Sequence, residues 1–251
     1  MEELSEVCYK KNFLKDVIVK VDFVSPVAEL NTTIPKDVAK AALTGFPIDE
    51  PKPAFTQAVR ISKDDVSATK QEFIEWNFFG SNREKRLVIS PLFILMVHNR
   101  YERFELFKDE FCRVVEPLFN ALPDTQASRI GLRFINQIVT PGTDPLYWQE
   151  YISPELLSVL GYRLDKAKPS RLLHNLEYAF DSFNLRFQYG IYNPDYPAPI
   201  RQRQFILDFD AYYRGLVDPR DIRTNMDMYH IQIQQLFERS ITDKLKGLMN
   251  E

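Results

Sequence analysis

The sequence predicts an α+β fold in which one structural unit, a strand, a short helix, several strands and a long helix, occurs twice. A strand-like alternation of polar and apolar residues opens each half, at residues 16–23 and 129–139. A short helix beginning at a proline follows in each half, and each half ends in a long amphipathic helix. We therefore expect a single domain, residues 1–251, built from repeats at 14–123 and 128–249, with a curved antiparallel sheet backed by two long helices.

The first half shows each of these elements in turn. Apolar residues at every second position predict the strand at 16–23. Pro35 opens a short helix that ends near Gly45, because proline suits a first helical turn and glycine a helix C-terminus. Further strands are predicted at residues 55–61, 72–79 and 86–98. Apolar residues at steps of three and four predict a helix over 101–122, with a kink at Pro117.

The second half repeats this order. A strand at 129–139 precedes a short helix from Pro154 to Gly161. Strands are then predicted at residues 171–180, 184–192 and 204–212. Asp218 and Pro219 begin the final helix. Its apolar stripe consists of Ile222, Met226, Tyr229, Ile233, Phe237, Ile241, Leu245 and Leu248.

The order of elements resembles that of the duplicated TATA-binding-protein fold, a saddle of antiparallel strands with helices on its convex side. A helix-grip arrangement, with a sheet wrapped around one long helix, is the alternative. Both folds bury the apolar helix stripes against one face of the sheet. Both leave the other face, or the cleft between the layers, available to a partner.

Composition narrows the classes of function. The chain has 32 Lys+Arg against 35 Asp+Glu and a net charge of −3, so it lacks the overall positive field that steers nucleic acid to a protein. Neither a signal peptide nor an apolar stretch of membrane-spanning length is visible, and we expect a cytoplasmic protein without a membrane partner. Cys8 and Cys112 are predicted to be thiols in a reducing compartment.

Several polar residues fall on predicted strands, and these are the candidate binding residues. Arg129 and Arg133 share one face of their strand, while Asn136 lies on the other. The two arginines, together with Arg186, suit a groove for an extended anionic partner, because guanidinium groups recognise carboxylates and phosphates. The alternative is that each arginine pairs with an acid on a neighbouring strand.

Asp208 and Asp210 share a face of the strand FILDFD and are the remaining candidates. Two such carboxylates can hold Mg²⁺ or Ca²⁺ when a third ligand joins them, but salt bridges to arginines such as Arg186 are favoured. We predict no metal site and no cofactor, since the chain lacks a phosphate-binding glycine loop, a nucleophile elbow and a calcium loop. No residue is assigned a catalytic role.

Four stretches are family landmarks: YKKNFLKDVIVKVDF, RIGLRFINQIVTP, FILDFD and LFERSITDKL. With these stretches in this order, the sequence resembles a sporadically distributed family of uncharacterised bacterial and archaeal proteins, and the resemblance covers most of the chain. The resemblance implies a prokaryotic cytoplasmic protein, inherited patchily as mobile or defence-associated genes are. It implies no activity, so no site residue is transferred from it.

The sequence therefore favours a non-catalytic binding protein over an enzyme. The expected partner is another protein, such as a toxin or a further component of a mobile defence module. Two alternatives stay open: a nucleic acid or small ligand bound on the free sheet face, and an enzyme without a recognisable motif. The pattern of residues indicates no particular oligomeric state.

Overall fold

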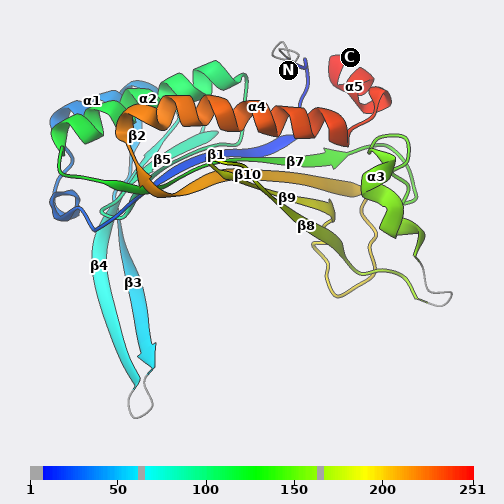
Figure 1. The fold of residues 1–251 in the computed structure, drawn as a ribbon, viewed down its shortest axis with the longest axis horizontal. Helices are drawn as coiled ribbons and strands as arrows, with labels where there is room; N and C mark the ends of the chain where they lie inside the picture. The colour runs from blue at the N-terminus through cyan, green and yellow to red at the C-terminus, as the bar shows by residue number, and fades with distance from the viewer. Residues whose placement is uncertain (1–7, 62–65, 163–166) are drawn as a thin grey trace. The chain divides into compact units, whose positions relative to one another are not determined.

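The computed structural model describes residues 8–61, 66–162 and 167–251. Within these residues the protein is an α+β structure in which one large antiparallel open sheet of ten strands packs with several helices (Figure 1). The predicted α+β class and the antiparallel sheet are thereby confirmed.

The strands run, in chain order, as β1 (Leu14–Phe23), β2 (Ile48–Asp49), β3 (Lys52–Ile61), β4 (Val66–Phe79), β5 (Lys85–Ile89), β6 (Phe93–His98), β7 (Ala127–Val139), β8 (Leu172–Ala179), β9 (Asn184–Ile191) and β10 (Gln204–Val217). The α-helices are α1 (Lys36–Gly45), α2 (Phe104–Ala121), α3 (Pro154–Leu157), α4 (Ile222–Ser240) and α5 (Asp243–Asn250). Short 3-10 turns lie at η1 (Ala28–Asn31), η2 (Ser158–Gly161) and η3 (Pro219–Asp221). The strand order across the sheet is β2-β4-β5-β6-β1-β7-β10-β9-β8, and β3 pairs with β4.

The chain divides into two compact units, and several strands contribute residues to both of them. Unit 1 comprises Met1–Val17, Gly131–Tyr213 and Thr224–Glu251. Unit 2 comprises Ile18–Ile130 and Arg214–Arg223. Each unit has its own buried apolar residues.

The core of unit 2 lies between its strands and the helices α1 and α2, which pack against each other. The predicted apolar stripe of α2 is buried, and α2 continues past Pro117 to its last residue, Ala121. The kink at Pro117 stays a prediction. Fully buried side chains in this core include Val19, Val38, Ala42, Phe46, Leu87, Ile94, Phe111 and Leu118.

The strand predicted over residues 86–98 is in fact two strands. β5 ends at Ile89 and β6 begins at Phe93, because Ser90 Oγ accepts hydrogen bonds from the amides of Leu92 and Phe93, each at 3.2 Å. Pro91 has no amide hydrogen to continue a ladder. The continuous apolar run of the sequence concealed this tight turn.

A long two-stranded ribbon is the second feature of unit 2. β3 and β4 pair over ten residues each, from Lys52 opposite Glu75 to Ile61 opposite Val66. The ribbon extends away from α1 and α2 (Figure 1). Nearer the helices, β4 also pairs with β2 and, on its other side, with β5.

In unit 1, α4 packs on one face of the strands β7, β10 and β9. The Phe134 ring of β7 lies 5.7 Å from His230, and the Phe209 ring of β10 lies 6.3 Å from Phe237. The apolar stripe predicted for this helix supplies much of the core. Buried residues here include Leu132, Leu185, Phe187, Leu207, Phe209, Met226, Tyr229 and Leu245.

The final helix is shorter than the sequence predicts. It stops at Ser240, and α5 begins only at Asp243. The reason is local pairing with the segment before α3: the Ser153 amide donates to the Ser240 carbonyl at 2.9 Å, and the Thr242 amide donates to the Tyr151 carbonyl at 3.1 Å. The two residues between α4 and α5 are therefore not helical, because the backbone at this point pairs with the segment before α3.

Candidate functional site

Four of the predicted binding residues come together on one face of the sheet in unit 1. Arg133 of β7 donates from Nε and Nη2 to the Asp208 carboxylate of β10, at 2.8 and 2.6 Å. Arg186 of β9 donates to Asp210 at 2.7 Å. This face is opposite to α4, because the intervening Phe209 points toward that helix. The expected cross-strand ion pairs, including the one from Arg186, are confirmed.

The other two candidates lie elsewhere. Asn136 is buried on the α4 face of β7 and donates to the Leu207 carbonyl at 3.3 Å, so it satisfies a backbone group inside the core. Arg129 belongs to unit 2, where its guanidinium lies 3.7 Å from Asp22. The structure therefore does not join these two residues to the cluster of four.

Charge pairing dominates the chemistry of this face. The hydrogen bonds that Arg133 donates to Asp208 raise the pKa of Arg133 above its usual value, although partial burial acts in the opposite direction. Within the described ranges, no group of three His, Cys, Asp or Glu side chains is placed to hold a metal ion. Each arginine of the cluster already binds a carboxylate, which leaves it less able to bind an anionic partner.

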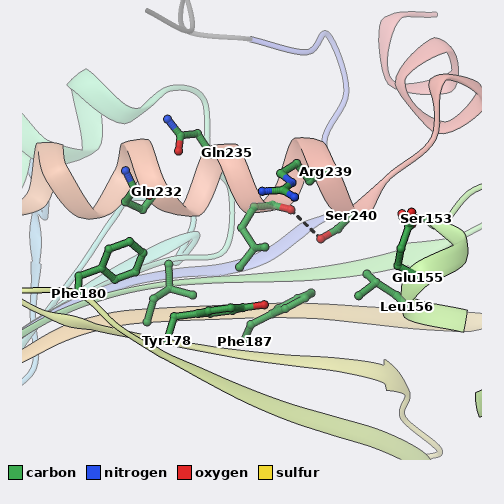
Figure 2. Close-up of a pocket in the computed structure, with 12 residues that line it drawn as sticks. Ser153, Glu155, Leu156, Tyr178, Phe180, Phe187, Gln232, Gln235, Arg239 and Ser240 are labelled. Atoms are coloured by element: carbon green, nitrogen blue, oxygen red, sulfur yellow. Dashed lines mark hydrogen bonds between the residues drawn. The ribbon is translucent and has the colours of Figure 1, made fainter. Parts of the chain in front are cut away.

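A groove in unit 1, which the sequence did not reveal, is a second site (Figure 2). It has a volume of about 650 Å³ and lies beside α4. Its apolar floor comes from β8 and β9, one wall comes from α4, and one end comes from the residues around α3. The lining residues are Ser153, Glu155, Leu156, Tyr178, Phe180, Leu185, Phe187, Gln232, Gln235, Leu236, Arg239 and Ser240.

The floor of the groove exposes large apolar side chains to water. Tyr178 is 41% exposed and Phe180 39%, and Leu176 on the same strand face is 40% exposed. Phe180 is stacked on Phe183 at 4.4 Å, which fixes its ring at the turn between β8 and β9. Contiguous exposed apolar surface of this kind is typical of a binding site.

The groove carries polar groups but not a catalytic arrangement. Ser240, which lines it, donates its hydroxyl to the Leu236 carbonyl at 2.6 Å, not to a base (Figure 2). Glu155 accepts a hydrogen bond from Ser153, which lowers the pKa of its carboxyl. The twelve lining residues include neither histidine nor cysteine. These twelve side chains therefore do not form a serine–histidine or cysteine–histidine pair.

A polar pocket of about 440 Å³ in unit 2 holds another cluster of titratable groups. Glu110 of α2 is nearly buried there, with Lys85 Nζ at 2.6 Å and His98 Nε2 at 3.0 Å from its carboxylate. A side chain at Gly45 would overlap this carboxylate. Burial alone raises the pKa of Glu110, but the hydrogen bonds from His98 and Lys85 outweigh it and lower that pKa. Lys85 and His98 thus offset the cost of burying the charged Glu110 carboxylate.

Sequence reasoning missed the groove because it depends on strand order. The apolar residues of β8 predict a half-buried strand equally well at the centre of a sheet and at its edge. Only the order, with β8 last, shows that Leu176 and Tyr178 stay uncovered.

Comparison of the chain with models of known protein families gave no match, and a search of curated proteins gave none either. The resemblance described above therefore stays a prediction. Among the helices of the described ranges, none combines the length and the apolar character needed to cross a bilayer.

Proposed function

We propose that the protein is a non-catalytic binding protein, and that its groove in unit 1 holds an apolar segment of a partner protein. The observation that carries this proposal is the exposed apolar floor formed by Tyr178 and Phe180 in a groove of about 650 Å³, with exposed Leu176 beside it on the same strand face. Covering apolar surface contributes roughly 25 cal/mol per Å² to binding, before the entropic costs of association are subtracted. Polar groups of α3 and α4 border the floor, as in other recognition sites.

The polar sheet face is a weaker candidate for the binding surface. Arg133 and Arg186 already bind Asp208 and Asp210, and the chain as a whole has a net charge of −3. A nucleic acid would have to displace these internal carboxylates. Binding through the apolar groove requires no such exchange.

A direct test uses a phage-displayed library of twelve-residue peptides selected on the folded protein. We expect enriched peptides to lose at least about tenfold in affinity with Tyr178→Glu, because the new charge lies on the apolar floor. Tyr213→Glu is the matched control, since Tyr213 is 36% exposed and outside the groove lining. Enriched peptides that bind Tyr178→Glu as tightly as the wild type would overturn the proposal, as would a selection without enrichment.

We also propose that the chain contains two copies of one unit, residues 14–123 and 128–249, in the manner of the TATA-binding-protein fold. The strand order supports this proposal: β6, β5 and β4 follow outward from β1, and β10, β9 and β8 follow outward from β7. The first strand of each half is thus adjacent to the last strand of that half. Superposition of the two ranges in an experimental structure is expected to align these strands and both long helices, and failure to align them would contradict the duplication.

For the biological setting, we propose that the partner is encoded beside the protein in a mobile defence module. The support is the family resemblance of the sequence, together with the exposed apolar groove. Co-expression with the products of the neighbouring genes, in wild-type and Tyr178→Glu forms, tests this setting. A neighbour that binds only the wild type is the expected result, and a set of neighbours that bind neither form would contradict it.

A further inference from the structure

Among the described residues, no strand neighbours one side of the β8 backbone. It pairs with β9 over eight residues, from Leu172 opposite Ile191 to Ala179 opposite Asn184. In the sheet formed by the described residues it is the last strand, and six of its eight residues are exposed. The outward amides and carbonyls of β8 are therefore available for pairing.

The equivalent strand of unit 2 is covered. β4 precedes β5 along the chain and pairs with it, as β8 does with β9. The outer side of β4 carries β2 and β3, both antiparallel to it. Phe78 of β4, which lies opposite Asp49 of β2, is 2% exposed, whereas Tyr178 of β8 is 41% exposed. Unit 1 thus lacks, among the described residues, the strand that covers this edge in unit 2.

The sequence of β8 does not protect this edge. Natural edge strands are usually protected by lysines, proline or a bulge, which discourage pairing with other chains. β8 reads LLHNLEYA, with no proline and with Glu177 as its only acid or base of fixed charge. Its register with β9 is continuous, so it has no bulge.

We infer that an extended segment of the partner adds to the outer edge of β8 as an antiparallel strand, an inference that rests on the proposed function of the groove. Every second side chain of the segment then lies beside Tyr178, which lines the groove, and Leu176, which shares its face of β8. The intervening side chains lie on the opposite face, beside Glu177. The partner segment is accordingly a strand that alternates apolar residues with lysine or arginine.

The test uses the tightest peptide from the display selection, resynthesised with one N-methylated amide at each position in turn. N-methylation removes one hydrogen-bond donor and keeps every side chain. Strand addition predicts that affinity falls about tenfold or more at every second position and stays within about twofold at the positions between, where the amides point away from β8. Hydrogen exchange of the outward amides of β8 should slow by a similar factor when the peptide is bound.

Other outcomes identify other occupants. A peptide bound as a helix would lose affinity at consecutive N-methylated positions, and a second copy of this chain on β8 would make the protein a dimer in sedimentation before any peptide is added. Either result overturns strand addition. If Tyr178→Glu abolishes binding while the N-methyl series shows no alternation, the groove function stands and strand addition fails. If Tyr178→Glu leaves binding intact, the groove function itself has failed.

Discussion

The role of Arg133 and Arg186 depends on the carboxylates that face them on the neighbouring strand β10. A strand arginine suits either recognition of an anion or pairing within the sheet. Asp208 and Asp210 lie on β10, between Arg133 on β7 and Arg186 on β9, and both carboxylates are nearly buried. Structural pairing therefore explains the polar residues of β10 without an external partner.

Arg133→Glu is expected to destabilise the protein by about 2 kcal/mol, because it leaves Asp208 buried beside a like charge. This value is below that of a fully buried pair, since the guanidinium is one-third exposed. Urea unfolding measures the loss. Arg220→Glu is the control, because Arg220 pairs with Asp218 at the surface and should leave stability unchanged. A stable Arg133→Glu protein that fails to bind its partner would instead support a recognition role for this face.

Glu110 provides a pH-dependent contribution to stability. Its folded pKa lies below the ordinary value of 4.5, so its contribution is present above that pH and is lost as the pH falls through the folded pKa. Glu110→Gln should lower stability at neutral pH by about 2 kcal/mol, because Lys85 is left without its carboxylate.

Unfolding free energies measured between about pH 7 and pH 3 test this expectation. The variant should lose less stability on acidification than the wild type does. Glu102→Gln, an exposed change in the same pocket, is the control and should follow the wild-type curve. An equally steep acid loss in Glu110→Gln would contradict the assignment.

Among the elements, the loop between β7 and α3 determines where α4 ends. The guanidinium of Arg203 donates to the Pro141 and Tyr147 carbonyls and lies 5.4 Å from the rings of Trp148 and Tyr151. The same loop supplies the backbone groups that pair with the residues after α4. A loop held in this way acts as a fixed support at one end of the groove.

Gly142→Ala should weaken this support. Gly142 has a φ of +138°, which L side chains rarely adopt, and its added methyl group would overlap the guanidinium of Arg203. We expect a loss of about 1 to 3 kcal/mol, measured by thermal unfolding. Gly247→Ala is the matched control, because the space around Gly247 within α5 is open and alanine favours helix. If Gly142→Ala left the stability unchanged, the loop backbone would be able to adopt another conformation without cost, and the expectation would be wrong.

At the scale of the whole molecule, the sequence predicted what depends on local periodicity. In α2 and β7 the spacing of apolar residues along the sequence matches the spacing of buried residues in the structure, so both elements were predicted correctly. The sequence did not predict the turn at Ser90, which depends on hydrogen bonds from backbone amides to the Ser90 hydroxyl. It also did not predict the helix break after Ser240, which depends on pairing with a backbone segment far away in the sequence. The groove was missed for a related reason: the position of β8 at the edge is a property of the assembled sheet.

The central position of β1 and β7 has a consequence for dividing the gene. These two strands are neighbours in the sheet although they belong to different halves of the chain. A split between Thr125 and Gln126, in the loop before β7, would give each fragment a new edge lined on one face by buried valines or isoleucines. We expect each fragment to aggregate when produced alone and the two to recombine when co-produced, so that the pair acts as a split protein whose reassembly reports on proximity.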